Sequence, residues 1–497
     1  MTAWAARSVS DAARRAARPI VGSVAETPSG AVLLLPALVV PTPLLGLDSA
    51  AVALAVASAA SLFVSSEAYG ALADRICSIM ATSSLRPPRS WSNHATSSRP
   101  GMQSTPMKVG MSLLTQGPEQ FTGTSSYIRE LLREFARHPS GVSIHGLCNE
   151  HAFEAFRDCA ADRVRLTSAV GGGVGALRVT RGHALMKSVV RPARLTRQFS
   201  PDVSVVHYPL TLGVPRTKLP TVLTLHDLQH HDLPANFSFA EHRWRRMLYD
   251  RYARTATLVV TVSNYSRCRI IEALGVAPER VIAIPHGVDP QRFAPDHAAA
   301  DQARLAPLNL PERFLFYPAS LWPHKNHMRL LDALARVSDD RVHLLLCGAT
   351  AGRLEALLAA AAERGLGNRV RHLGFVPADA LPAIYRRAAA LVFPSVYEGF
   401  GLPPLEAMAS GCPVASSTRG SLAEVCGDAT AVLEPDNPEQ MARTISTVLD
   451  DEGLRRRLRS AGLAQAARFS WRAAADAHVA AYERARGLRA VPARATA

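Results

Sequence analysis

Two glutamates on either side of a glycine turn are the residues of this chain best placed to do chemistry. Glu398 and Glu406 stand eight positions apart, with Gly399-Phe400-Gly401 between them. Pro403-Pro404 and the good helix formers after them predict a helix behind the turn, because proline suits a first helical turn. A turn that leads into a helix N-terminus presents free N–H groups and a partial positive charge to phosphate. The pattern therefore predicts a sugar-nucleotide site, and a plain turn with two solvated glutamates is the alternative.

Lys325 and His226 are the other candidate site residues. Lys325 follows the predicted strand Phe314–Tyr317 and is one of only four lysines, so we expect it to supply a point charge for phosphate. His226 closes the predicted strand Thr221–Leu225, where it would face the cleft and contact the reacting sugar or the acceptor. The alternatives are an exposed loop lysine and a structural histidine. A metal site is a further alternative, formed by His226, His230, His231 and Asp232.

The sequence offers little support for other chemistries. Gly171–Ala176 formally fits G-x-G-x-x-A, but no apolar strand precedes it and no acidic residue follows at the usual distance, so we interpret it as a flexible loop. The chain has no G-x-x-x-x-G-K-[ST], G-x-S-x-G or H-E-x-x-H pattern. Kinase, serine hydrolase and metalloprotease chemistry therefore have no anchor.

The composition indicates a folded, basic, cytoplasmic protein. The 497 residues are 48% hydrophobic and 20% charged, and the net charge of +15 comes almost wholly from scattered arginines. No Lys/Arg-rich block marks a nucleic-acid surface, so anionic lipid or phosphorylated substrates are the better partners for this charge. Seven scattered cysteines without a C-x-x-C pair favour reduced thiols in a cytoplasm and no disulfide framework.

Residues 1–106 form an N-terminal extension that differs from the rest. Residues 31–66 are almost wholly apolar and long enough to cross a bilayer, but Pro36, Pro41, Pro43 and Asp48 divide them. A membrane hairpin or anchor, an upstream region without a folded role, and a cleaved signal are the competing interpretations. Residues 83–106 are rich in Ser, Pro and Arg and predict a linker.

From Met107 onward, strands alternate with amphipathic helices, which predicts an α/β fold with parallel sheets. The pattern restarts at Phe314, so we expect two Rossmann-like domains that face a cleft. The predicted first domain spans residues 107–290 and the second 291–470. A final segment, 471–497, is expected to form a helix and tail.

The segment Ser395–Pro413 resembles the retaining glycosyltransferases of family 4, which have the two-domain GT-B fold. The resemblance extends over about residues 107–490. Further segments that carry it are Val281–Asp289, similar to the family's I-P-N-G-V-D with His286 in place of Asn, Thr261–Ser266, Leu373–Pro377 and Phe469–Trp471. The last of these opens a helix that, in the family, crosses back to the first domain.

The resemblance implies a role for each candidate residue. Glu406 would bind the ribose hydroxyls, Glu398 a hydroxyl near the C3–C4 edge of the transferred sugar, and Lys325 the leaving phosphate. His226 would contact the transferred sugar on the acceptor side. The remaining donor-binding positions implied are Gly123, Thr124, Val376, Gly399, Phe400, Gly401 and Leu402. The family mechanism implies no metal, no other cofactor and no protein nucleophile, since departure and attack occur on one face of the sugar.

One departure from the family pattern bears on the donor. Many members carry an arginine about five positions before the lysine, where this chain has Ser320 or Leu321. The variant Trp322–His327 resembles bacterial mannosyltransferases of polysaccharide assembly, which favours GDP-mannose as donor and a lipid-linked or glycan acceptor at the inner-membrane surface. UDP-glucose or UDP-N-acetylglucosamine transfer and an inactive, membrane-tethered sugar-nucleotide-binding scaffold are the rival functions. A nonhydrolysing sugar-nucleotide epimerase would share the architecture but would lack the spacing of Glu398 and Glu406 around the glycine turn.

Overall fold

The computed structural model of the protein describes residues 107–117, 123–170, 192–296 and 298–488. The apolar segment 31–66, the linker 83–106 and the glycine-rich segment Gly171–Ala176 therefore lie outside the described residues. Among the helices that the structure describes, none combines the length and the apolar character needed to span a bilayer.

The first domain is built on a parallel sheet of seven strands in the order β3-β2-β1-β4-β5-β6-β7. Neighbouring strands pair in parallel throughout, so their carboxyl ends meet at one edge. The strands are β1 (Lys108–Leu113), β2 (Ser143–Asn149), β3 (Val164–Val170), β4 (Val203–Tyr208), β5 (Thr221–Thr224), β6 (Leu258–Thr261) and β7 (Val281–Ala283).

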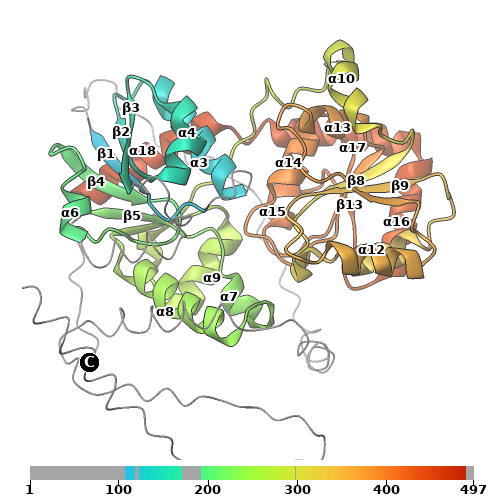
Figure 1. Cartoon of the computed structure of the whole chain (residues 1–497), viewed down its shortest axis with the longest axis horizontal. Coiled ribbons are helices and arrows are strands. Elements are labelled where there is room, and N and C mark those ends of the chain that lie inside the picture. Colours follow the sequence, from blue (N-terminus) through green and yellow to red (C-terminus); the bar gives the residue numbers. More distant parts are fainter. Residues whose placement is uncertain (1–106, 118–122, 171–191, 297, 489–497) are drawn as a thin grey trace, which may run out of the picture. The chain divides into compact units, whose positions relative to one another are not determined.

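Helices cover both faces of this sheet (Figure 1). One apolar core lies under α3 and α18 and contains Val205 and Val222, and a second contains the neighbouring residues Val206 and Leu223. Alternate residues of the same strands thus point into opposite cores, as the pleat requires. The helices are α3 (Gly123–Arg137), α4 (Glu150–Phe156), α6 (Pro192–Thr196), α7 (Gln229–Asp232), α8 (Phe239–Thr255) and α9 (Asn264–Leu274).

The second domain repeats this design on a parallel sheet of six strands in the order β10-β9-β8-β11-β12-β13. The strands are β8 (Phe314–Pro318), β9 (His343–Cys347), β10 (Val370–His372), β11 (Ala390–Phe393), β12 (Val414–Ser416) and β13 (Ala431–Val432). The helices are α10 (Ala298–Leu305), α11 (His327–Leu334), α12 (Leu354–Glu363), α13 (Leu381–Arg387), α14 (Leu402–Ala409), α15 (Leu422–Cys426), α16 (Pro438–Asp450) and α17 (Glu452–Ala466). Figure 1 shows α13, α14 and α17 on one face of this sheet and α12 and α16 on the other.

The last helix of the chain, α18 (Trp471–Gly487), packs into the first domain (Figure 1). Ser470 caps it by accepting a hydrogen bond from the backbone N–H of Ala473, which fixes where the helix begins. Trp471 and Tyr482 are buried in the core under α3. A helix that follows the second domain in sequence therefore completes the core of the first.

The structure confirms the predicted α/β class and its two parallel-sheet domains. The predicted strand Thr221–Leu225 is observed as Thr221–Thr224, and the predicted strand Phe314–Tyr317 as Phe314–Pro318. Strands β2 and β3 were absent from the sequence prediction. Both lie at one end of the sheet, where His145 and Gly146 interrupt the apolar run of β2.

Candidate active site

Lys325 and Glu398 form an ion pair at the edge of the second sheet where the strands end. β8 and β11 are parallel neighbours, and the two residues lie in the loops that follow them. The Nζ atom of Lys325 lies 2.6 Å from Oε1 of Glu398, and the two side chains are only 16% and 12% exposed. The sequence placed both residues at one edge, and the structure brings their charged atoms into contact.

Backbone and amide hydrogen bonds hold the two loops of this ion pair together. The Tyr317 hydroxyl donates to the carbonyl of Lys325 at 2.6 Å, and the N–H of Val396 donates to the carbonyl of His324 at 2.9 Å. Asn326 has a positive φ of 62° and its Nδ2 donates to the carbonyl of Pro394 at 3.2 Å. The last two of these contacts join the loop of Lys325 to the loop of Glu398 and so support the position of the ion pair.

The glycine turn lies directly against the first domain. A Cβ atom on Gly399 would lie 2.5 Å from the carbonyl oxygen of His226, so only glycine fits there. The carbonyl of Gly399 also accepts a hydrogen bond from Oγ of Ser263 at 2.8 Å. Gly401, with φ of 113°, turns the chain into α14. The turn that should hold a diphosphate therefore meets the strand end that carries His226.

The N-termini of two helices converge beside this turn. Gly123 begins α3, and a Cβ on it would lie 4.0 Å from Cδ1 of Leu402, the first residue of α14. Thr124 follows in the first turn of α3 and is partly exposed. Helix N-termini carry free N–H groups and positive potential, and α14 begins four residues after Glu398, the partner of Lys325. The arrangement suits a multiply charged anion.

Glu406 lies one turn inside α14 and accepts a hydrogen bond from the Tyr385 hydroxyl at 3.0 Å. Burial raises the pKa of Glu406 to about 7, although the positive charge of Arg292 and the hydrogen bond from Tyr385 oppose that rise. Glu406 and Arg292 line a small cavity together with Glu130 and Leu402. At neutral pH this carboxyl group therefore lies close to the midpoint of its titration.

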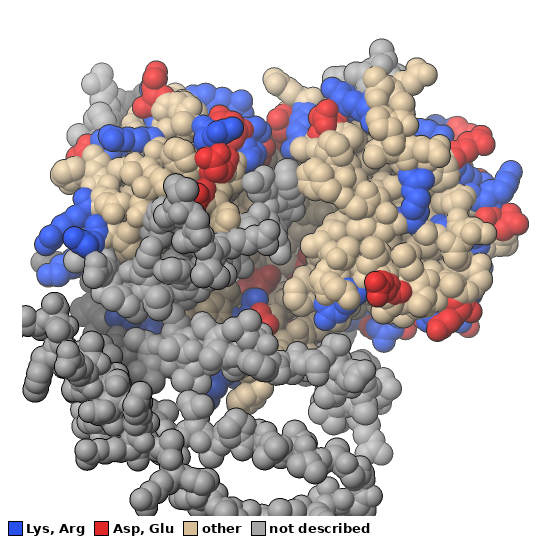
Figure 2. Space-filling model, viewed as in Figure 1, with Lys and Arg blue, Asp and Glu red and all other residues tan. Residues whose placement is uncertain are grey.

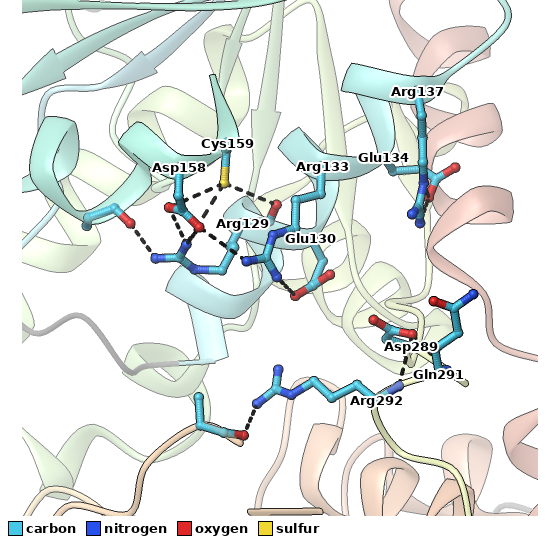
Figure 3. Close-up of polar contacts among 12 residues, drawn as sticks. Arg129, Glu130, Arg133, Glu134, Arg137, Asp158, Cys159, Asp289, Gln291 and Arg292 are labelled. Atoms are coloured by element: carbon cyan, nitrogen blue, oxygen red, sulfur yellow. Dashed lines mark hydrogen bonds and ion pairs between the residues drawn. The ribbon is translucent and has the colours of Figure 1, made fainter. Parts of the chain in front are cut away.

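Arg292 and Glu130 form the far wall of that cavity. Figure 3 shows Glu130 of α3 and Arg292 of the interdomain connection on facing sides, whereas Arg129 reaches away to Asp158. Nη2 of Arg292 donates to the carbonyl of Ala378 at 2.8 Å, two residues beyond Val376. Val376 itself is partly buried against the core of the second domain. The connection between the domains is thus tied to the loop that carries Val376, one of the donor-binding positions implied by the resemblance.

His226 presents a neutral imidazole to the same region. Its Nε2 lies 3.0 Å from the carbonyl oxygen of Pro209, which can only accept, so Nε2 carries the proton. Burial lowers the pKa of His226 below its usual value, although the Pro209 carbonyl partly opposes this. Nδ1 is therefore unprotonated and is a hydrogen-bond acceptor. A sugar hydroxyl could donate to it.

The structure does not bring together the four residues that the sequence suggested as a metal site. Asp232 accepts hydrogen bonds from Arg269 at 2.5 Å and from the Tyr397 hydroxyl at 3.0 Å. His230 and His231 turn instead to Asp250, with Nε2–Oδ1 distances of 3.1 and 2.9 Å. The ligand atoms of this second group lie within 4.8 Å of one another. His226 belongs to neither group.

Several residues of the site escaped the sequence analysis because no local pattern marks them. His286 lies between the rings of Tyr127, Phe400 and Trp471, at centroid distances of 4.9 to 5.5 Å, and burial lowers its pKa well below the usual value. The sequence identified His286 only as a departure from a family motif. Glu130, Arg292 and Tyr385 carried no signal at all, since each acts through a contact with a distant part of the chain.

Models of two glycosyltransferase families match the chain, one on each domain. The model described as "Glycosyltransferase Family 4" matches residues 121–292, and the model described as "Glycosyl transferases group 1" matches residues 301–465. The two matches cover most of the residues that the structure describes.

Curated proteins and solved structures show the same likeness. The O-antigen chain mannosyltransferase B of Escherichia coli is 33% identical over 267 residues, 53% of this chain and 70% of that protein. The serotype-specific mannosyltransferase WbdA of Escherichia coli is 31% identical over 280 residues, or 54% of this chain, but the match spans only 34% of WbdA. The structure of HepE from Anabaena in complex with UDP-glucose superposes with a TM-score of 0.61 at 19% identity, covering 76% of this chain and all of HepE, which supports the GT-B fold.

Proposed function

Since the chain belongs to the family 4, group 1 glycosyltransferases, we propose that it transfers a hexose, with retention, from a nucleotide sugar to a lipid-linked or glycan acceptor. The observation that carries this proposal is the Lys325–Glu398 ion pair, set beside a glycine turn and two helix N-termini. The likeness to two mannosyltransferases supports mannose as the sugar and GDP-mannose as the donor.

Donor binding would exchange the partners of the ion pair. The diphosphate binds the Lys325 ammonium, whose nitrogen lies 2.6 Å from a carboxylate oxygen of Glu398, and the released carboxylate accepts a hydrogen bond from a hydroxyl of the sugar. One charge-assisted contact is thereby replaced by two. The exchange would also make donor binding depend on both residues, since either one alone is left with an unpaired, largely buried charge.

In the proposed transfer, the bond between C1 of the sugar and the β-phosphate oxygen breaks and the phosphate leaves with the electron pair. The acceptor hydroxyl attacks C1 from the same face, and its proton passes to the departing phosphate oxygen. Lys325 and the N–H groups of the glycine turn stabilise the charge that develops on the phosphate. His226 orients the sugar, because its unprotonated Nδ1 accepts a hydrogen bond from a sugar hydroxyl.

We propose that no metal is required, because Lys325 and the two helix N-termini can together carry the charge of the leaving group. The group His230, His231 and Asp250 is the place where a metal would bind if this is wrong. Activity that survives a chelator, with no bound metal by elemental analysis, supports the proposal. Loss of activity that a divalent cation restores contradicts it.

The nucleotide is tested by thermal unfolding of the full-length protein with GDP, UDP and their sugar conjugates. A ligand that binds only the folded state contributes about 2.7 kcal/mol at 100 times its Kd, which shifts the midpoint measurably. A shift with GDP and GDP-mannose alone supports the proposed donor. A shift with UDP compounds, the nucleotide in the HepE complex, favours the rival donors. No shift with any nucleotide favours an inactive scaffold.

We also propose a cytoplasmic location at the inner-membrane surface, where a lipid-linked acceptor would be reached. The basic charge of the chain supports this location. Fractionation of cells should recover the protein with inner membranes, at least in part. Recovery only in the soluble fraction at low salt would contradict it.

A further inference from the structure

Helix α8 carries an outward face on which large apolar and basic side chains alternate. Phe239 is 80% exposed and Met247 is 39% exposed, while Arg243, Arg246 and Arg254 are also exposed. Residues three and four apart share a helix face, so these five side chains occupy about one third of the circumference of α8. The opposite face of α8 is anchored in the domain core through Leu248 and Tyr252.

The positive charge of this face is not neutralised within the part of the chain that the structure describes. Neither Arg243 nor Arg246 forms an ion pair with any described acidic group. The helix's own Glu241 pairs with Arg245 at 2.8 Å, away from this face. Figure 2 shows a different surface on the second domain, where basic and acidic side chains occur in small mixed groups. The α8 face therefore gathers Arg243, Arg246 and Arg254 on one side of a single helix, with no ion pair to a described acidic group.

The single carboxylate on the α8 face is turned inward. Asp250 lies between Arg246 and Arg254 in the stripe, but it is only 3% exposed. Its oxygens accept hydrogen bonds from His230 and His231 of α7, which packs against α8. Asp250 thus lies at the bottom of a hollow whose lining includes Phe239, Arg243, Arg246, Met247 and Arg254, and the three arginines outnumber the one carboxylate there.

We propose that the α8 face docks on an anionic lipid bilayer, with the arginines at the phosphate groups and Phe239 and Met247 inserted among the headgroups. Charge complementarity carries the choice of occupant, because an interfacial helix combines basic residues with bulky apolar ones in this way. The inference names the surface through which the proposed membrane association occurs. The experiment below measures lipid binding, which does not depend on sugar transfer. The proposed transferase activity and the proposed docking surface can therefore fail separately.

The experiment measures partitioning of the full-length protein onto vesicles of phosphatidylcholine alone and with 30% phosphatidylglycerol, over a series of salt concentrations. The double variant Arg243→Gln/Arg246→Gln should lose roughly 25-fold in partitioning to the anionic vesicles, since each basic residue near the surface is worth about 1 kcal/mol. The matched control Arg457→Gln/Arg468→Gln removes two exposed arginines from α17 and the loop after it and should leave partitioning unchanged.

The apolar part of the face is tested by Phe239→Ser, which should weaken binding several-fold at high salt, where electrostatic attraction is screened. Leu358→Ser, at a residue 38% exposed on α12, is its control. Equal partitioning of the arginine variant and its control at every salt concentration overturns the proposal. In that case α8 would bind an acidic protein partner instead, or residues 1–106 would account for all the lipid binding.

Discussion

The two halves of the candidate site use opposite electrostatics. On the second domain, Lys325, Glu398 and Glu406 are ionisable groups held near one another, and two of them form an ion pair. On the first domain, three buried histidines are neutral, because burial lowers the pKa values of His207 in β4, His226 after β5 and His286 after β7. The side that should bind phosphate has charged groups that can change partners when the donor binds. The side that should face the sugar has uncharged hydrogen-bond acceptors.

This contrast sets the size of the effect expected at each residue. Hydrogen bonds to charged groups contribute about 1.5–3 kcal/mol, whereas those between neutral groups contribute about 0.5–1.5 kcal/mol. Substitutions in the charged half should therefore reduce activity by one to two orders of magnitude, and those in the neutral half by about one order or less. Equal effects in both halves would break the comparison.

The largest effect is expected for Lys325→Ala. Removing the ammonium group takes away the charge that stabilises the departing phosphate, so kcat should fall by about 10²-fold or more. Steady-state kinetics with a fixed acceptor measures it. Lys218→Ala, at an exposed lysine of the first domain, is the control and should retain full activity. A Lys325→Ala enzyme with normal kcat would place the leaving-group charge on another residue, with Arg292 the first to examine.

A smaller effect, with a distinct pH dependence, is expected for Glu406→Gln. The pKa of Glu406 is about 7, so its carboxylate is present above that pH and is lost as the pH falls below it. If the carboxylate binds the ribose hydroxyls, the KM for the donor should rise about tenfold between pH 8 and pH 6 in the natural protein. The Gln variant should have a raised KM that is flat over this range. A variant that keeps the natural pH profile would contradict the assignment.

The relative positions of the residues in the charged half were predictable from the sequence because most of them lie close together in the chain. Glu398, the glycine turn and Glu406 lie within nine residues, and the strand-to-helix pattern around them fixes their relative positions. Lys325 required only one further step, since parallel neighbouring strands end at the same edge of a sheet. Conversely, the sequence could not show that Lys325 and Glu398 touch, because that depends on the loop contacts of Asn326 and Tyr317.

The neutral half was only partly predictable because its partners lie far apart in sequence. His226 was recognised from its place at a strand end, but Tyr127 and His478, which meet at 2.9 Å, are 351 positions apart. A buried His or Tyr has the same local pattern whether it packs or binds. The metal alternative named Asp232 as a ligand for the same reason, since Asp250, which lies against His230 and His231, comes from a different helix.

His226→Phe should produce a smaller loss than the charged-half variants. The ring shape is kept, but the unprotonated Nδ1 that would accept a sugar hydroxyl is lost, so kcat/KM should fall by about tenfold or less. The stability of the variant is checked by urea unfolding, because the carbonyl of Pro209 also loses its donor. A loss as large as that of Lys325→Ala would mean that His226 takes part in charge stabilisation, and the contrast between the halves would then be wrong.

The smallest effect on activity is expected beneath His226, in a buried chain of hydrogen bonds. Its contacts join Tyr482 to His207 (2.9 Å), His207 to Thr224 (2.8 Å), Thr224 to Tyr127 (3.2 Å), and Tyr127 to His478 (2.9 Å). Nδ1 of His478 lies 2.7 Å from the carbonyl of Ala474, so that nitrogen carries the proton and Nε2 accepts from Tyr127. Because the histidines are neutral, each hydroxyl group can donate its proton to only one of its two partners. Every hydrogen bond in the series therefore points the same way, from the Tyr482 hydroxyl towards the carbonyl of Ala474.

Tyr127→Phe should therefore destabilise the protein more than Tyr482→Phe. The first removes two contacts in the middle of the chain and leaves Nε2 of His478 without a donor, at a cost of about 1–3 kcal/mol, while the second removes one contact at its start. Urea unfolding at pH 7 measures the difference, and equal losses would contradict the one-way arrangement.

The same chain makes stability depend on pH with a definite sign. Burial lowers the pKa of His478 from 6.5 to about 4, so the unfolded chain takes up a proton before the folded protein does. Stability from this group is complete above pH 6.5 and is lost as the pH falls towards 4, by about 3 kcal/mol in all. His478→Gln should be less stable at pH 7 but should lose less on acidification. A variant that loses as much as the natural protein would mean that other buried histidines set the acid limit of the first domain.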